Sequence, residues 1–493
     1  MKNIGFILRE ITLGGLENLV LDLSEQFQTK DAIIHLICTE SIGDNWDIEV
    51  NDGITVKAFN YWEYDDLFKY LYEMKDYLDS LNLDCVYVND SIYGNSLLSL
   101  IKTKTKKITV LHSILDTCKN IALSNKDYID GIIAVSPATY KKLNGNDDIN
   151  KVMIMNGIGF PNVIEKKCIN NETLNLLYSG RIADKDKGVF SLVDIVEKLH
   201  LNSDISFNLK LVGDGPDRKK LERLFKERRL LHLVDFLGYL PKSELSKQYQ
   251  ISDILLFPSK HEAFGLSIVE AQYFGCIPLA TRIEGATDQT INDGINGFLI
   301  DKDENEAENY VKVIKELYDN VSYHKRLSKC AQKNAQRFSI KFTAEQWLEF
   351  ADSVEQKLIV GDSKKSIQDS IKCLSVHTDI NILKQKNMFL QKYYNKNIQL
   401  NKFNGKKIAI FGTLHMAYYL YTLFNPISEV KGFIDNNSMK ESINNIKVYK
   451  ENRLIEMDLD YIIISVESNS SNFIKERLIA SFGTEVITWK ELI

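Results

Sequence analysis

The stretch DILLFPSKHEAFGLSIVEAQYFG, residues 253–275, combines a strand pattern, a polar loop and a helix pattern. The short apolar run ILLF predicts a buried strand of a parallel sheet, because it is bounded by polar turns. From Leu266 the apolar spacing predicts a helix. Gly265 stands just before it, where a residue without a side chain lets a ligand approach the backbone closely. The stretch therefore predicts a strand–loop–helix unit with open amides at the helix start.

Two glutamates lie on either side of this predicted helix start. Glu262 is in the loop, and Glu270 lies in the helix itself. The amides at a helix N-terminus attract anions, so phosphates could lie there while the two carboxylates reach hydroxyl groups at different ends of one elongated ligand. Taken alone, the pair is explained more simply as a helix cap and a solvated helix residue.

Strand and helix patterns alternate outward from this unit. LNLLYSG, FNLKLVGDG and LVDFLGYL precede it as predicted strands, and an earlier series begins with NIGFIL and IIHLIC. This alternation predicts the α/β class, with doubly wound parallel sheets in two consecutive units. Residues 156–170 contain Gly157, Gly159 and Pro161, which break the periodicity and predict a hinge.

The last part of the chain differs in composition. Residues 356–403 hold nine lysines and three aspartates but no glutamate or arginine, which predicts a basic helical linker. KKIAIFGTLHMAYYLYTLF then begins a third, small Rossmann-like unit. Of a G-x-G-x-x-G pattern only Gly412 is present, with Leu414 and Ala417 at the other places. We therefore expect a packing, docking or regulatory role rather than redox or epimerase chemistry.

Length and composition limit the classes of function. At 493 residues the chain is too long for one core. A net charge of −6 argues against a nucleic-acid partner. The seven cysteines form no C-x-x-C pair, so neither zinc nor a disulfide framework is expected. MKNIGFILRE predicts a first strand rather than a signal peptide, and no apolar run approaches the ~20 residues of a membrane span. We expect a reduced, cytoplasmic chain.

Two cations follow a predicted strand in YSGRIADKDKGVFSL. Arg181 stands at the strand exit and Lys187 just before the next helix. Cations at the carboxyl edge of a parallel sheet suit a diphosphate, although two surface cations in a polar loop are common. LVGDGPDRKKL places Gly213 and Gly215 in another strand-to-helix turn.

The joint order of these motifs resembles glycosyltransferase family 4, a family of retaining nucleotide-sugar transferases with the GT-B fold of two facing Rossmann-like domains. The resemblance covers roughly residues 1 to 350 and also includes GGLENLVLDLS, LHS, AVSPATYKKL, MNGIGF and GINGFLID. It implies an acceptor-side domain at residues 1–165, a nucleotide-sugar domain at 166–336 and a crossover helix at 337–355. The basic linker at 356–403 and an accessory domain at 404–493 follow.

The resemblance also implies roles for individual residues. Arg181 and Lys187 would hold the donor diphosphate and neutralise the leaving group. Glu262 would contact the donor sugar, Glu270 the ribose, and His112 the sugar from the other domain; without the resemblance, His112 would be a satisfied histidine at the edge of the core. The other implied donor-binding positions are Gly14, Gly15, Tyr239, Leu240, Phe264, Gly265, Leu266 and Ser267. Family members need no metal, so neither a metal nor a cofactor is expected.

The implied partners are a nucleotide-sugar donor, favoured to be a UDP-sugar, and a glycan or lipid-linked glycan acceptor of the surface-polysaccharide kind. RIEGATD departs from the family pattern with Glu284 and Asp288, which leaves the donor sugar open. IKTKTKK, residues 101–107, and the basic linker predict peripheral contact with an anionic membrane, with solvated lysine-rich faces as the alternative. Two other functions stay open: a GT-B nucleotide-sugar 2-epimerase, and a non-catalytic sugar-binding scaffold.

Overall fold

The chain divides into two compact units in the computed structural model. Met1–Ala58 and Asp79–Ser366 form the first, and Phe59–Leu78 and Ile367–Ile493 the second. The structure describes residues 2–11, 14–42, 53–59, 67–102, 104–159, 173–357, 366, 369–370, 373–374, 398, 400–412, 415–436, 442–443, 446–466, 470–482 and 484–492. Most of the predicted hinge at 156–170 and of the predicted linker at 356–403 lies outside these ranges, as does Leu414.

The first sheet consists of seven parallel strands in the order β3-β2-β1-β4-β5-β6-β7. Its strands are β1 (Lys2–Ile11), β2 (Ala32–Ile42), β3 (Ile54–Ala58), β4 (Cys85–Asn89), β5 (Lys106–Leu111), β6 (Gly131–Ala134) and β7 (Asn150–Met153). The helices are α1 (Gly15–Gln28), α3 (Ile92–Leu97), α4 (Asp116–Ala122) and α5 (Pro137–Lys142). The strand order reverses between β1 and β4, and their carboxyl ends flank the crevice where such sheets bind ligands.

The second sheet consists of six parallel strands in the order β10-β9-β8-β11-β12-β13, and its order reverses between β8 and β11. Its strands are β8 (Leu174–Ser179), β9 (Phe207–Val212), β10 (Val234–Gly238), β11 (Ile254–Phe257), β12 (Ile277–Thr281) and β13 (Phe298–Ile300). The helices are α6 (Asp184–Lys187), α7 (Ser191–Asn202), α8 (Arg218–Glu227), α9 (Lys242–Ile251), α10 (Leu266–Tyr273), α11 (Thr287–Thr290), α12 (Glu306–Asp319) and α13 (Val321–Ala335).

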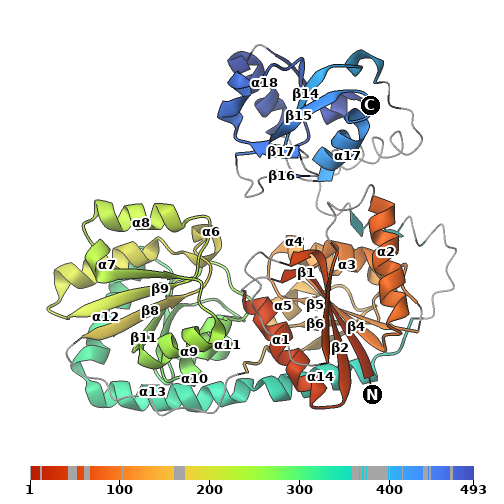
Figure 1. Ribbon diagram of the computed structural model, residues 1–493. Coiled ribbons are helices and arrows are strands. Elements are labelled where there is room, and N and C mark those ends of the chain that lie inside the picture. Colours follow the sequence, from red (N-terminus) through yellow and green to blue (C-terminus); the bar gives the residue numbers. More distant parts are fainter. Residues whose placement is uncertain are drawn as a thin grey trace. The chain divides into compact units, whose positions relative to one another are not determined.

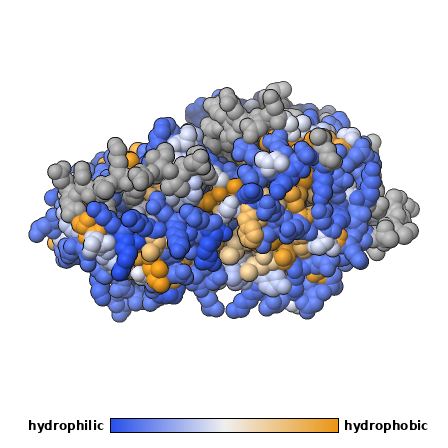
Figure 2. Space-filling model, turned by 90° about the horizontal axis from the view of Figure 1, so that it is seen from below, coloured by the Kyte–Doolittle hydropathy of each residue, from blue (hydrophilic) through white to orange (hydrophobic). Residues whose placement is uncertain are grey.

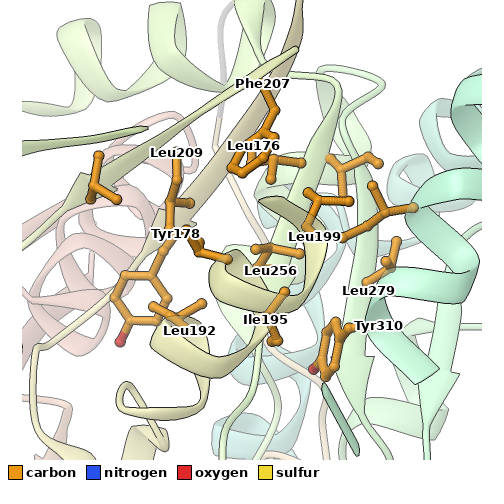
Figure 3. Close-up of a cluster of buried hydrophobic side chains, with 14 of the residues drawn as sticks. Leu176, Tyr178, Leu192, Ile195, Leu199, Phe207, Leu209, Leu256, Leu279 and Tyr310 are labelled. Carbon is orange, nitrogen blue, oxygen red and sulfur yellow. The ribbon is translucent and has the colours of Figure 1, made fainter. Parts of the chain in front are cut away.

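Both faces of the second sheet are buried, which explains why its strands read as continuous apolar runs. Figure 1 shows α7 and α8 on one face and α9 and α10 on the other. Leu176 of β8 belongs to the core cluster on the first face, which also contains Leu192 and Leu199 of α7 (Figure 3). Its neighbour Leu177 packs on the other face, in the cluster that contains Tyr249 of α9. Burying each such side chain contributes about 1.5–3 kcal/mol.

Helix α14 (Ile340–Ser353) follows the second sheet in sequence but packs on the first sheet. Trp347 is fully buried there, and the Tyr87 hydroxyl of β4 donates a hydrogen bond of 2.9 Å to the Trp347 carbonyl. The end of the first unit is thereby fastened to the sheet that begins it.

The second unit contains a third sheet, in the order β16-β17-β15-β14-β18-β19, in which β16 alone is antiparallel to its neighbour. Its strands are β14 (Lys407–Phe411), β15 (Glu429–Ile434), β16 (Ser442–Ile443), β17 (Ile446–Tyr449), β18 (Tyr461–Ile464) and β19 (Glu485–Thr488). The helices are α17 (His415–Phe424) and α18 (Ser470–Phe482), and most of α2 (Leu67–Ser80) belongs to this unit. The predicted α/β class, with two Rossmann-like domains and a third, is confirmed.

Within the described ranges, no helix has the length and hydropathy needed to cross a membrane. On the face shown in Figure 2, hydrophilic residues predominate and hydrophobic residues occur in small groups.

Candidate functional site

The carboxyl ends of β8, β9, β10 and β11 meet at one edge of the second sheet, here called the donor edge. The loops after these strands carry the predicted donor-side residues. These are Arg181, Lys187, Tyr239, Leu240, Glu262, Phe264, Gly265, Leu266, Ser267 and, in α10, Glu270. Because the strand order reverses between β8 and β11, the residues after these two strands flank the ligand crevice of the sheet.

Lys187 and Glu262 form an ion pair across this crevice. The Lys187 ammonium lies 2.6 Å from Oε2 of Glu262 and 5.6 Å from the centre of the Phe257 ring. The other oxygen, Oε1, accepts a hydrogen bond of 3.1 Å from the Ala263 amide. Both charged side chains are mostly buried, with 27% and 13% of their surface exposed. The sequence assigned the lysine to a phosphate and the glutamate to a sugar, whereas the structure pairs them with one another.

Gly188 explains how these two loops come together. It ends α6 with φ +59°, and a Cβ atom there would lie 2.1 Å from the Pro258 carbonyl oxygen of the other loop. The amides of Lys260 and His261 donate to the Asp186 carbonyl at 2.9 and 3.0 Å. Only glycine permits this approach, which positions Lys187 beside Glu262.

A second ion pair, which the sequence analysis missed, reinforces the same contact between loops. The ammonium of Lys260 lies 2.6 Å from Oδ2 of Asp184, and Oδ1 of this aspartate accepts from the Phe190 amide at 3.0 Å. Asp184 lies between Arg181 and Lys187 in the sequence, and Lys260 lies two residues before Glu262, but no local pattern marks either residue as half of an ion pair. The pair holds the two loops of the donor edge together.

The start of α10 presents the open amides that the sequence predicts. Gly265 caps the helix with φ +87°, in the left-handed region that favours glycine. The amides of Leu266 and Ser267 make no hydrogen bond within the described part of the chain. The Phe264 ring is buried 5.5 Å from the Phe338 ring, so Phe264 can offer a ligand only its backbone. The helix start can therefore bind an anion.

Glu270 is half-buried and has a specific partner. Its Oε2 accepts a hydrogen bond of 2.7 Å from the Tyr249 hydroxyl. Burial raises the pKa of Glu270, while this hydrogen bond and the nearby Lys242 ammonium oppose the increase. Oε1 has no hydrogen bond to any residue that the structure describes. This environment differs from that of a solvated helix residue and leaves one oxygen for a ligand hydroxyl group.

Arg181 is exposed at the donor edge. The turn after β9 packs on the backbone around it: a Cβ atom on Gly213 would lie 2.0 Å from the Gly180 carbonyl oxygen, and one on Gly215 would lie 2.3 Å from that of Ile182. Gly213 also has φ +124°. Among the described residues, the Arg181 guanidinium has neither a hydrogen bond nor an ion-pair partner. The two glycines hold its backbone in place while the side chain stays available.

Tyr239 and Leu240 differ in exposure. The Tyr239 side chain is 48% exposed, with its hydroxyl 3.5 Å from the Asp214 carbonyl oxygen. Leu240 packs against the core cluster below α9 and α10. Only the tyrosine ring is placed to stack with a planar ligand.

The first sheet approaches the donor edge through the start of α1. Gly14 caps this helix, and a Cβ atom on Gly15 would lie 3.3 Å from Cδ1 of Leu266. A Cβ atom on Gly14 would lie 2.2 Å from Oε2 of Glu17, so the carboxylate of the first helical turn folds over that glycine. The two predicted glycines thus lie where the two halves of the first unit come close together.

His112, directly after β5, is neutral. Its Nε2 lies 2.9 Å from Oδ1 of Asn89, whose amide nitrogen donates to the carbonyls of Ile7 and Tyr87. The asparagine oxygen is therefore an acceptor, and Nε2 of the histidine carries the proton. Burial lowers the pKa of His112 to about 3. Its Nδ1 consequently offers a lone pair to a ligand.

The loop that departs from the family pattern also lies between the two halves. Gly285 has φ +75°, and its carbonyl accepts a hydrogen bond of 3.1 Å from the Ala138 amide of α5. A Cβ atom on Gly285 would lie 2.8 Å from the same amide nitrogen. In this chain the RIEGATD loop therefore rests on the first sheet's helix layer.

In the basic stretch at 101–107, Lys102 and Lys104 are exposed, whereas Lys106 and Lys107 are at least partly buried. The Lys106 ammonium donates to the carbonyls of Ala351 and Asp352, and that of Lys102 donates to the Asp79 carbonyl. Lys107 is only 5% exposed. Lys102 and Lys106 thus bond to the backbone of their own unit, and the predicted membrane contact stays a prediction. Within the described residues, no group of three or more His, Cys, Asp or Glu side chains is arranged to hold a metal ion.

In the second unit, Gly412 serves the packing of two strands. It has φ +109°, and a Cβ atom there would lie 2.4 Å from Oγ of Ser465, which follows β18. The retained glycine of the degenerate pattern thus has a structural explanation that needs no nucleotide. The expectation of a packing or docking role stays a prediction.

Comparisons with known proteins show similarity to glycosyltransferases. Residues 160–334 match the family model described as glycosyl transferases group 1. An uncharacterised glycosyltransferase of Methanocaldococcus jannaschii is 32% identical over 44% of this chain and 56% of that protein. The alpha-monoglucosyldiacylglycerol synthase of Acholeplasma laidlawii is 26% identical over 41% of this chain and 48% of that enzyme. The chain thus spans about half the length of these curated relatives.

The fold is shared with solved structures. HepE of Anabaena, crystallised with UDP and glucose, superposes with a TM-score of 0.59 at 19% identity. The superposition covers 72% of this chain and the whole of that one. The chain therefore has the GT-B fold, and its residues 160–334 are similar to the glycosyl transferases group 1 family.

Proposed function

We propose that this chain is a retaining, metal-independent glycosyltransferase that transfers a sugar from a nucleotide-sugar, favoured to be a UDP-sugar, to a hydroxyl group of a polysaccharide, glycolipid or related glycan. The Lys187–Glu262 pair beside the open amides of α10 carries the proposal. It combines a cation, a carboxylate and a helix start at the point where parallel sheets bind ligands. UDP bound to HepE supports the nucleotide.

The proposed chemistry follows from these groups. Breaking the bond between a sugar and a diphosphate builds negative charge on the phosphate and positive charge on the sugar ring. Arg181, Lys187 and the amides at the start of α10 would stabilise the phosphate charge, because fixed donors in a sheltered site act strongly on developing charge. Glu262 would bind the sugar hydroxyl groups and Glu270 those of the ribose, and Tyr239 would stack on the base.

In this proposal Lys187 exchanges Glu262 for the donor diphosphate, and this exchange sets the order of the binding steps. Without donor, the ammonium neutralises Glu262, which avoids an unpaired and mostly buried carboxylate. An arriving diphosphate competes for the ammonium, and the sugar hydroxyl groups then replace it at the carboxylate. Binding of phosphate and binding of sugar are thereby coupled through one ion pair.

Acceptor-dependent release of UDP tests the proposal. The full chain is incubated with UDP-glucose, UDP-galactose or UDP-N-acetylglucosamine, with and without a glycan and glycolipid acceptor panel, and UDP is measured by chromatography. We expect release that depends on acceptor, and proton NMR of the product should show the anomeric configuration of the donor. An inverted product contradicts retention.

The same assay separates the alternatives. A 2-epimerase would convert UDP-N-acetylglucosamine to its epimer without any acceptor, and a scaffold would bind UDP without turnover. Either result would replace the proposed transferase activity.

A further inference from the structure

Asp90 is a carboxylate at the carboxyl edge of the first sheet that the proposed function does not use. It follows β4 directly, at the point between β1 and β4 where the strand order reverses. Its backbone has φ +46°. Oδ1 is buried without a hydrogen-bond partner in the described residues. Since nearly all buried polar side-chain atoms in folded proteins have such a partner, this atom is open to a hydrogen bond from a group outside the chain.

Charged groups surround Asp90 on several elements. Burial raises the pKa of Asp90 to about 7; the Arg9 guanidinium of β1 opposes the increase, and the Glu17 carboxylate of α1 adds to it. The Cys118 thiol of α4 also interacts with Asp90. His112 lies next to it through Asn89 and stays neutral. Arg9 itself already pairs with Glu10, so the surroundings hold more negative than positive charge.

This edge faces the donor edge. Glu17 lies near both edges. The pKa values of Tyr239 at the donor edge and of Asp90 at this edge are raised mainly by burial, and the Glu17 carboxylate adds to both increases. The near-contact of Gly15 with Leu266 brings the starts of α1 and α10 together. A molecule bound at the β1–β4 crevice therefore lies opposite the donor site.

We propose that Asp90 accepts a hydrogen bond from the hydroxyl group of the acceptor, and that this crevice takes an uncharged polyol such as a sugar ring rather than a phosphorylated acceptor. The proposal rests on the proposed function and names the substrate class at its acceptor side. The unpartnered Oδ1 supplies the hydrogen-bond acceptor. The excess of carboxylates over free cations repels a phosphate. The Nδ1 lone pair of His112 offers a second acceptor for a hydroxyl group.

Binding of D-glucose as an acceptor probe tests this proposal in the full chain, by saturation-transfer NMR with and without saturating UDP. Asp90→Asn removes the charge and keeps the shape, and asparagine tolerates a left-handed backbone. At pH 8 its glucose affinity should fall roughly three- to tenfold, because asparagine keeps an acceptor oxygen but its neutral hydrogen bond is weaker than one to a carboxylate. Its UDP affinity should match the wild type, and its melting temperature should not fall below that of the wild type. The matched control is Asp147→Asn, at the amino end of the same sheet, where the carboxylate is 84% exposed.

Two further readouts distinguish direct contact from a structural role. Glucose affinity of the wild type should increase from pH 6 to pH 8 as Asp90 ionises, and Asp90→Asn should abolish this dependence. Glucose 6-phosphate should bind more weakly than glucose. A glucose signal that is absent, or that Asp90→Asn leaves unchanged, overturns the assignment, and tighter binding of the phosphate overturns the substrate class. Failure of the wild type to bind UDP would count against the proposed function. Glucose binding measured without UDP would still test the role of Asp90.

Discussion

The two facing sheet edges of the first unit solve the problem of buried charge in different ways. At the donor edge, Lys187 neutralises Glu262, and Glu270 accepts from a buried tyrosine. At the edge of the first sheet, His112 is held neutral and Asp90 is left without a hydrogen-bond partner in the described residues. At the donor edge the lysine is paired with a carboxylate of the same chain. At the edge of the first sheet the histidine carries no charge, and the aspartate carboxyl group is open to a ligand.

This difference indicates what each edge is built to receive. A dianionic diphosphate can displace a carboxylate from a lysine, so an internal ion pair is a suitable resting state for a donor site. A neutral hydroxyl group cannot break an ion pair with comparable gain, because its hydrogen bonds are weaker than charge-assisted ones. An acceptor site for hydroxyl groups therefore needs open hydrogen-bond acceptors, and Asp90 and His112 provide them.

The largest expected effect is that of Glu262→Gln on turnover. Glutamine keeps the volume but cannot stabilise positive charge on the sugar, so the rate of UDP release with acceptor should fall about 100-fold or more. UDP affinity should stay within about threefold, because Lys187 is freed for the phosphate. Steady-state kinetics and calorimetry measure the two effects. Glu244→Gln, at a surface pair with Lys247, is the control. Equal losses of turnover and UDP affinity would contradict the division of roles.

Lys187→Ala and Glu270→Ala should act on binding rather than on the chemical step alone. Each removes a charge-assisted hydrogen bond to UDP, which corresponds to roughly ten- to a hundredfold weaker affinity. Calorimetric titration with UDP measures it. Lys185→Ala, an exposed lysine of the same short helix, should bind UDP like the wild type. Wild-type affinity in both variants would remove the donor assignment and with it the contrast between the edges.

Asp90→Asn should have a smaller effect, on stability, with a defined dependence on pH. The folded pKa is raised to about 7 from an ordinary value of 3.8. Between these values the unfolded chain loses the proton first, so the stability of the wild type falls as pH rises through this window. Asparagine cannot ionise. The variant should therefore match the wild type near pH 4 and be more stable than the wild type at pH 8. Calorimetric melting of both proteins at both pH values measures the difference. If the advantage of the variant over the wild type does not grow from pH 4 to pH 8, burial does not hold Asp90 protonated.

The smallest expected effect is that of metal removal. If Arg181, Lys187 and the α10 amides supply all the positive charge at the donor edge, EDTA should change the rate of UDP release by less than about twofold. Loss of activity with EDTA and recovery with manganese would mean that a divalent cation binds at the donor edge. The charges of the donor edge would then not be balanced within the chain alone, and the two edges would differ less than proposed.

Much of the fold could be predicted because its signals are local. The apolar runs before Arg181 and Glu262 are strands β8 and β11, and Gly265 starts α10 as its position predicts. The short strand β7 was missed, since four residues of partly exposed backbone carry too little apolar pattern. The short helices α3, α4 and α5 were missed because six or seven residues are too few to show a helical period.

The candidate site was predicted as a set of residues but not as a set of contacts. The sequence by itself determined which side chains follow which strands, because strand ends are marked by local periodicity and by glycine. Only the tertiary structure decided that Lys187 pairs with Glu262, a partner 75 residues away, and that Asp90 stands in a crevice with no partner among the described residues. Pairing and burial depend on which strands become neighbours, and strand order is a property of the assembled sheet that no stretch of chain contains.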